Sequence, residues 1–488
     1  MTINNKTSKT NTFGLILGPL LFLGILLFYK PEDLSFEGLF MLALTAWIAT
    51  WWITEAISIS ATALLPLVLL PLANVLPIAE TAKSYSHPMV LLYMGGFMIA
   101  MAIEKWNLHK RIALTIINFI GLNVKLIILG FMIATAFLSM WISNTATSLM
   151  MLPIAIAVTS QLDPNQNIDS QIGKALMLGV AYSASIGGLA TLIGTPTNII
   201  LGSVIQELFQ VEISFNKWMT FGLPISIVLL FICWYYLTRF AFTFTQISSE
   251  DSAKVEINKQ LDDLGSISIA EKRVGLIFGL VSIAWISRSG FLDKLLPFLD
   301  DTIIALSGVL LLFVIPSGKG TFKLLDWKTA EKIPWGILIL FGGGLSLAEG
   351  FKTSGLAQWI GNQFVTLEFI GFGLFLLIII LAVNFLTEIT SNMATASMLL
   401  PILAAVSFSM GVHPFGLMIG ATMSSSCAFM LPVATPPNAV VFGSGYLRMR
   451  DMVKAGLWMN LISIIIIALF TYFLLPLIWN IELKNYPF

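Results

Sequence analysis

The chain has 488 residues, of which 57% are hydrophobic and only 11% are charged, and its 26 basic and 26 acidic side chains give a formal net charge of zero. Soluble domains carry about 25% charged residues, so this composition excludes a water-soluble globular protein. The apolar residues form runs long enough to cross a hydrocarbon core of about 30 Å as helices, without the alternation typical of a β-barrel. We therefore expect an all-α polytopic membrane protein with about eleven transmembrane helices.

The first predicted element is an N-terminal tail followed by one helix, over residues 1–36. Its apolar run lacks a small-residue cleavage site, so we expect this helix to be retained. Residues 37–242 follow as the first half of the membrane region. Within it we predict a re-entrant helical hairpin near 125–160 and a helix that breaks near 194–198, where the sequence reads GTPTN. Proline removes a backbone donor and disfavours helix in the residue before it, which predicts the break.

Residues 243–272 contain the longest hydrophilic segment of the chain. This segment is too short for a domain, so we interpret it as a cytoplasmic linker. The second half, residues 273–488, repeats the features of the first. We predict a second re-entrant hairpin near 368–411 and a second break near 434–438, where the sequence reads ATPPN.

The two halves contain two copies of one sequence pattern. Ser143–Val158 and Ser391–Val406 are identical at ten of sixteen positions, and each copy is followed by a Thr-Pro-x-Asn motif. With a cytoplasmic N-terminus, 19 basic residues fall inside and 7 outside, as the positive-inside rule requires. This topology puts the C-terminus outside and inverts the second copy. Inverted repeats with broken helices are typical of secondary transporters, whose sites lie at the repeat interface.

Polar residues stand immediately before a helical run in both copies, as Ser143-Asn144-Thr145 and as Ser391-Asn392. A single copy would be interpreted as an ordinary N-cap. Two symmetry-related copies, each with a downstream break, favour an anion site instead, because free N–H groups at the positive end of a helix attract anions. One tip suits one carboxylate, so two facing tips predict a dicarboxylate ligand.

No Lys or Arg lies in the repeated motifs, so a doubly charged anion would lack a fixed positive charge. Bound sodium would supply it, because a hard cation prefers oxygen ligands. The candidate sodium ligands are hydroxyls, amide oxygens and freed carbonyls in both copies. They are Ser139, Ser143, Asn144, Gly194, Thr387, Thr390, Asn392 and Ala434.

Two acidic residues need separate interpretation. Glu388 is a carboxylate in an apolar run, and such residues are functional candidates by default. A structural role, bonding to the backbone of the hairpin, remains an equal alternative. Glu55 lies near a membrane boundary, where we expect a structural or interfacial role.

At these residues the sequence resembles the divalent anion:sodium symporter family, the carriers of succinate, malate, fumarate, citrate and sulfate. The resemblance rests on the WWITEA segment, on the paired tips followed by Pro153 and Pro401, and on the two Thr-Pro breaks. It implies a homodimer in which a mobile transport domain moves against a scaffold like an elevator. It also implies sodium ligands at the positions named above. The predicted substrate contacts are Ser143, Asn144, Thr145, Thr195, Ser391, Asn392, Met393, Thr435 and Pro436.

The function predicted on this basis is sodium-coupled symport of C4-dicarboxylates across the inner (plasma) membrane, with no enzymatic activity and no nucleic-acid partner. A sodium-coupled citrate or sulfate carrier remains an alternative, because Met393 replaces the threonine of the family motif. A sodium-independent exchanger on the same fold is a further alternative, against which the oxygen-bearing side chains of Ser139 and Thr387 argue. A hydrolase using Ser143 would need a base within hydrogen-bond reach. No histidine lies beside either motif.

Overall fold

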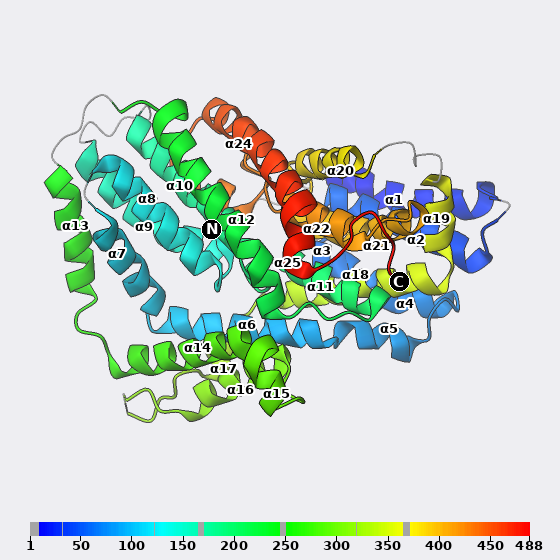
Figure 1. The fold of residues 1–488 in the computed structure, drawn as a ribbon, viewed down its shortest axis with the longest axis horizontal. Coiled ribbons are helices and arrows are strands. Elements are labelled where there is room, and N and C mark those ends of the chain that lie inside the picture. The colour runs from blue at the N-terminus through cyan, green and yellow to red at the C-terminus, as the bar shows by residue number, and fades with distance from the viewer. Residues whose placement is uncertain are drawn as a thin grey trace.

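The computed structural model describes residues 9–31, 33–121, 123–163, 170–244, 250–318, 320–364 and 371–488. In these residues every regular element is a helix, apart from one isolated β-bridge between Pro316 and Lys323 (Figure 1). The helices of the first half are α1 (Lys9–Phe28), α2 (Phe36–Thr54), α3 (Ile59–Thr62), α4 (Leu65–Leu72), α5 (Ile78–Tyr85), α6 (Pro88–Lys105), α7 (Leu108–Ile120), α8 (Val124–Ser139), α9 (Asn144–Leu162), α10 (Gln171–Gly188), α11 (Pro196–Phe209), α12 (Phe215–Tyr236) and the π-helix η1 (Leu237–Ala241).

The remaining helices begin in the predicted linker and continue to the C-terminus. They are α13 (Glu250–Asp263), α14 (Ile269–Ser287), η2 (Arg288–Leu292), α15 (Asp293–Leu295), α16 (Asp301–Val314), α17 (Trp327–Ala330), α18 (Trp335–Thr353), α19 (Leu356–Phe364), α20 (Phe372–Thr387), α21 (Asn392–Ser409), α22 (Pro414–Ser425), α23 (Pro436–Phe442), α24 (Met449–Leu469), η4 (Phe470–Leu474) and α25 (Leu475–Trp479).

Many of these helices are apolar along their whole length. Seven helical segments of the described chain are long and apolar enough to cross a membrane, and five shorter apolar helices accompany them. A helix satisfies its own backbone hydrogen bonds, which lipid cannot do. The all-helical architecture confirms the predicted class of a polytopic α-helical membrane protein.

Each predicted hairpin region contains two helices joined by a short tip. In the first, α8 ends at Ser139 and α9 begins at Asn144, and in the second, α20 ends at Thr387 and α21 begins at Asn392. Each pair packs against the helix that follows it, α8 and α9 against α10, and α20 and α21 against α22 (Figure 1). The two pairs are therefore built in the same way.

The chain is non-helical at residues 189–195, between α10 and α11, and at residues 426–435, between α22 and α23. Each segment overlaps the predicted break, near 194–198 or 434–438, only in its last two residues. Helix resumes at Pro196 and at Pro436. Each Thr-Pro proline occupies the first helical position. Proline suits that position because no intrahelical N–H is needed there and its φ is already helical. The motif therefore restarts a helix after the break.

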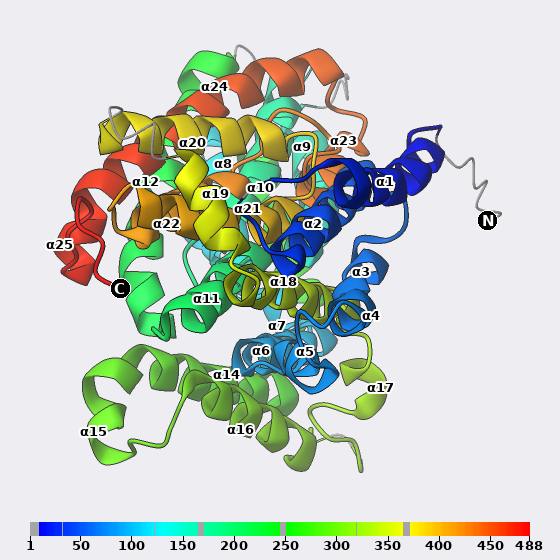
Figure 2. The ribbon, with the colours of Figure 1, turned by 90° about the vertical axis from the view of Figure 1, so that its right-hand side faces the viewer.

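The predicted linker is partly helical. Its helix α13 packs against α7 and α9, and residues 245–249 lie outside the described residues. Arg111 Nε donates a hydrogen bond to Glu271 Oε1 at 2.6 Å, which ties the end of the linker to α7. Figure 2 shows α14 and α16 together at the edge of the molecule, with α6 between them and the helix pairs.

Candidate functional site

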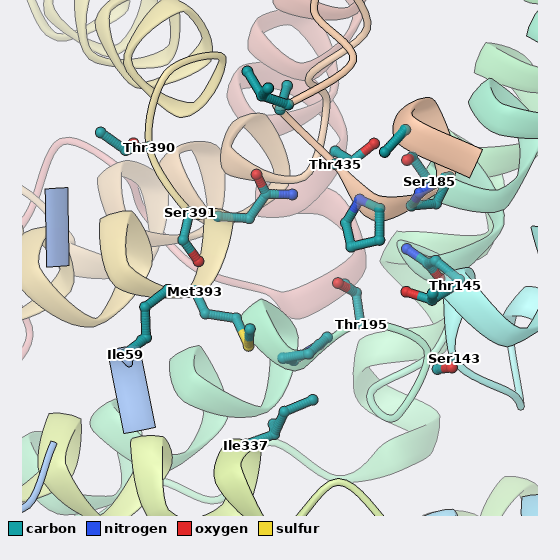
Figure 3. A pocket seen from close by; sticks show the side chains of 18 of the residues that line it. Ile59, Ser143, Thr145, Ser185, Thr195, Ile337, Thr390, Ser391, Met393 and Thr435 are labelled. Carbon is teal, nitrogen blue, oxygen red and sulfur yellow. The ribbon is translucent and has the colours of Figure 1, made fainter. Parts of the chain in front are cut away.

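The tips of both helix pairs and both non-helical segments meet at one cavity of about 780 Å³. Figure 3 shows Ser143 and Thr145 of the first tip across from Ser391 and Met393 of the second, with Thr195 between them. The predicted site residues that line the cavity are Ser143, Asn144, Thr145, Gly194, Thr195, Thr390, Ser391, Asn392, Met393, Ala434, Thr435 and Pro436. Of the predicted set, Ser139 and Thr387 do not line it.

Three helices of eight or more residues begin at the cavity. Ser143 caps α9, and its Oγ accepts a hydrogen bond from the N–H of Ala146 at 3.2 Å. Ser391 holds the same place before α21, and Thr195 before α11, and neither side chain makes a capping hydrogen bond. The first N–H groups of a helix lack intrahelical partners and carry the positive end of the helix dipole. The cavity is therefore suited to anions.

Ser139 and Asn144 form an oxygen-rich cluster behind the first tip. Ser139 is fully buried, and its Oγ lies 2.5 Å from Asn144 Oδ1 and 2.7 Å from the Ala184 carbonyl oxygen. The same terminal atom of Asn144 lies 3.2 Å from the Ala184 carbonyl oxygen and 3.3 Å from that of Gly194. An amide oxygen among other oxygens is repelled unless a cation lies between them or the amide turns to present its nitrogen. Oxygen donors of this kind fit a hard cation such as sodium.

Thr387 and Asn392 repeat this arrangement behind the second tip. Thr387 is fully buried, its Oγ1 lies 2.6 Å from Asn392 Oδ1, and it donates to the Ser425 carbonyl oxygen at 2.9 Å. Each tip asparagine thus contacts both the cavity and a buried hydroxyl behind it. The structure therefore places Ser139 beside Asn144 and Thr387 beside Asn392, as pairs of residues that were predicted as sodium ligands.

Thr390, also predicted as a sodium ligand, forms its hydrogen bonds with residues outside the second cluster. Its hydroxyl donates to the Leu386 carbonyl oxygen at 2.9 Å and lies 2.7 Å from Thr395 Oγ1. These are local hydrogen bonds around the end of α20 and the start of α21. Thr387 is therefore the hydroxyl that accompanies Asn392.

Two asparagines to which the sequence analysis assigned no role hold the non-helical segments together. Asn198 is fully buried, and its Nδ2 donates to the carbonyl oxygens of Gly188 at 3.1 Å and Thr191 at 2.8 Å. Asn438 makes the equivalent pair of bonds in the second segment, at 3.1 and 3.0 Å. The signal was present in the sequence, because asparagine follows Thr-Pro at the same spacing in both copies.

Glu388 is 3% exposed and contacts the second non-helical segment. Its carboxylate accepts hydrogen bonds from the backbone N–H groups of Phe429, Met430 and Leu431 at 2.8, 2.9 and 3.0 Å. It also accepts one from Asn460 Nδ2 at 2.7 Å. Buried N–H groups outside a helix need such partners. Of the two roles considered for Glu388, these contacts favour the structural one. The backbone N–H groups that its carboxylate binds lie in the non-helical segment after α22.

The chain is similar to known proteins in both sequence and fold. The family model described as the sodium:sulfate symporter transmembrane region matches residues 9–480. The chain is 48% identical to the sodium-dependent dicarboxylate transporter SdcS of Staphylococcus aureus strain bovine RF122, over 99% of this chain and 96% of that relative. It is 47% identical, with the same coverage, to SdcS of Staphylococcus aureus strain USA300.

Two solved transporter structures share the fold. Neisseria gonorrhoeae MtrF matches with a TM-score of 0.58 and 14% identity over 96% of each chain. The Alcanivorax borkumensis YdaH transporter matches with a TM-score of 0.57 and 13% identity over 81% of this chain and 87% of that one. At these identities the likeness concerns the fold alone.

The relatives found by sequence are named as transporters, in agreement with the prediction that the protein is not an enzyme. The family match spans almost the whole chain, and the full-length relatives are close to half identical. Together with the repeated motifs around the cavity, these matches show that the chain belongs to the divalent anion:sodium symporter family of membrane-embedded transporters.

Proposed function

We propose that the protein is a secondary active transporter that couples sodium entry to the uptake of C4-dicarboxylates such as succinate, malate and fumarate. The observation that carries the proposal is one cavity at which two similar tips meet, each backed by a buried hydroxyl beside an asparagine. A cavity of about 780 Å³ suits a small molecule. The names of the Staphylococcus aureus relatives, which pair sodium with dicarboxylate, support the same reading.

In this mechanism each tip binds one carboxylate of the substrate. No described residue that lines the cavity carries a positive charge, so the sodium ions at the two oxygen clusters supply it. Asn144 and Asn392 belong to both the clusters and the cavity wall, and so each links a sodium ion to the anion. When sodium leaves, the attraction for the dianion falls and the substrate is released.

The movement that we propose is an elevator-like displacement. The helix pairs and the broken helices, α8–α11 and α20–α23, would form the mobile part, and the two halves would be inverted repeats. The remaining helices that line the cavity, including α2, α6 and α18, would belong to a scaffold through which two protomers form a homodimer. We place the N-terminus in the cytoplasm, the C-terminus outside and the protein in the plasma membrane.

Sodium dependence is the test of this function. We expect uptake of labelled succinate into proteoliposomes to require an inward sodium gradient, because a dianion in the cavity has no other positive partner. Malate and fumarate should compete with succinate more strongly than citrate and sulfate do. Strong competition by citrate or sulfate would favour those carriers instead, and equal uptake with choline in place of sodium would favour a sodium-independent exchanger.

A second prediction concerns Met393, which lines the cavity where the first tip has Thr145 (Figure 3). Its thioether offers no donor, whereas a threonine hydroxyl can donate to a carboxylate oxygen, a bond to a charged group worth about 1.5 to 3 kcal/mol. We expect Met393→Thr to lower the KM for succinate about fivefold or more. The reciprocal change, Thr145→Met, should raise the KM by a similar factor. An unchanged KM together with a lower melting temperature of Met393→Thr would contradict this prediction.

A further inference from the structure

The cavity wall contains one charged side chain among the described residues, and that side chain is acidic. Glu55 lies at the C-terminal end of α2, in the WWITEA segment, and lines the cavity together with Trp52 and the tips of both helix pairs. It is exposed, and its carboxylate has no hydrogen bond or ion pair to any described residue. An unpaired negative charge therefore faces the space in which an anion is proposed to bind.

Three local features argue against a stabilising role for Glu55. It caps α2 in the left-handed conformation, with φ 47° and ψ 41°, where glycine or asparagine is preferred. Its carboxylate lies at the negative end of the α2 dipole, which favours cations. No hydrogen bond or ion pair to a described residue stabilises the carboxylate. Local rules of this kind are broken mainly at functional sites, where another benefit offsets the cost.

We propose that Glu55 sets the charge selectivity of the cavity, admitting sodium and disfavouring anions of more than two negative charges. This inference rests on the proposed transport function. The Coulomb energy between two groups is proportional to the product of their charges, so Glu55 repels a trianion more strongly than a dianion and attracts a cation. The helix N-termini and sodium ions bound at the oxygen clusters favour anions of any charge. Glu55 is the group that separates a dicarboxylate from a fully ionised tricarboxylate.

The test compares Glu55→Gln with the unmodified transporter in proteoliposomes at an alkaline pH, where every carboxyl group of succinate and citrate is ionised. We expect citrate to inhibit labelled succinate uptake about two- to fivefold more effectively, relative to unlabelled succinate, once the charge is removed. The sodium concentration for half-maximal uptake should rise. Both effects should shrink at high ionic strength, because salt screens an exposed charge.

Three further variants separate charge from structure. Glu55→Asp keeps the charge and should behave as the unmodified protein. Glu55→Asn removes the charge with a residue that suits the left-handed conformation, so it should match Glu55→Gln in selectivity and be at least as heat-stable as the unmodified protein. Glu37→Gln removes an exposed carboxylate from the first turn of the same helix and should change neither the ratio of citrate to succinate inhibition nor the sodium dependence.

The outcomes distinguish this inference from the proposed function. If the unmodified protein shows no sodium-driven succinate uptake, the proposed function is wrong and the role of Glu55 falls with it. If that uptake is present and both charge-removing variants keep the ratio of citrate to succinate inhibition of the unmodified protein, the transport function stands and the role assigned to Glu55 is overturned. A loss of selectivity in Glu55→Asp as well would also overturn it, because the charge would not be its cause.

Discussion

Replacing Asn144 with alanine is expected to abolish sodium-dependent succinate uptake while leaving the protein folded. The side chain lies in the oxygen cluster with Ser139 and also lines the cavity, so the change removes a sodium ligand and a substrate contact together. Each interaction with a charged group is worth about 1.5 to 3 kcal/mol, which predicts a loss of uptake of about a hundredfold or more. Asn392→Ala should have an effect of the same size, because Asn392 holds the same position beside Thr387.

Asn123 provides a matched control on the same helix pair. It is an exposed asparagine at the start of α8, and its Oδ1 accepts a hydrogen bond from the N–H of Lys125 at 2.9 Å. Asn123→Ala removes a helix cap and should cost about 1 kcal/mol of stability without changing sodium activation. Initial rates measured against sodium concentration check all three variants. Normal sodium activation in Asn144→Ala would show that this side chain is not a sodium ligand.

Much of the site could be predicted because the motifs that form it occur twice in the sequence. The repeated serine and asparagine of the two tips predicted helix N-termini at one cavity, and the structure lines the cavity with both. Ser139 and Thr387 were found by their equal distance from the repeated serines, four residues earlier in each copy. Repetition in these cases replaced the information that an alignment of relatives would provide.

The limits of the breaks were harder to predict. The Thr-Pro motifs were placed at the breaks, whereas each proline begins the next helix and the non-helical segment lies before it. Residues 189–193 contain neither proline nor glycine, so their composition does not predict a break. The segment is held open by tertiary hydrogen bonds, among them those of Asn198. Helix propensity depends on the local sequence and does not predict such tertiary hydrogen bonds.

The role of Glu388 depends on contacts that have no signature along the chain. Its backbone partners begin 41 residues away and Asn460 is 72 residues away. The first copy has no carboxylate at this place, because Met140 holds the equivalent position after α8. There, Thr191 Oγ1 donates to the Met140 carbonyl oxygen at 2.5 Å. The repeat in sequence therefore covers the asparagines that follow the two Thr-Pro motifs, but not Met140 and Glu388.

This difference leads to a second large effect, on stability. Glu388→Ala should leave the partly buried N–H groups of Met430 and Leu431 without their carboxylate partner, and each unsatisfied donor costs about 1 to 3 kcal/mol. The buried N–H of Phe429 also loses the carboxylate but keeps Asn460 Oδ1 as an acceptor at 3.1 Å. A loss of several kcal/mol is a large part of the 5 to 15 kcal/mol that stabilises a typical folded protein. We expect a large fall in melting temperature in detergent. Glu388→Gln retains one acceptor oxygen and should fall less. Asn460→Ala removes one donor to the carboxylate and one acceptor of the Phe429 N–H, but it leaves the three backbone bonds of Glu388 in place and should fall least.

The effect of sodium on the melting temperature distinguishes this structural role of Glu388 from a role in sodium binding. Because Glu388 acts on the backbone, its variants should lose the same stability in sodium-free buffer as in saturating sodium, whereas Asn392→Ala should lose mainly the stabilisation that sodium adds. Glu37→Gln, which removes an exposed carboxylate from the first turn of α2, should lower the melting temperature only slightly, and equally with and without sodium. A Glu388→Gln protein with an unchanged melting temperature in sodium-free buffer, but without sodium-dependent stabilisation or uptake, would show that the carboxylate serves the ion. The order of melting temperatures among Glu388→Ala, Glu388→Gln and Asn460→Ala, measured with and without sodium, therefore decides what this buried charge does.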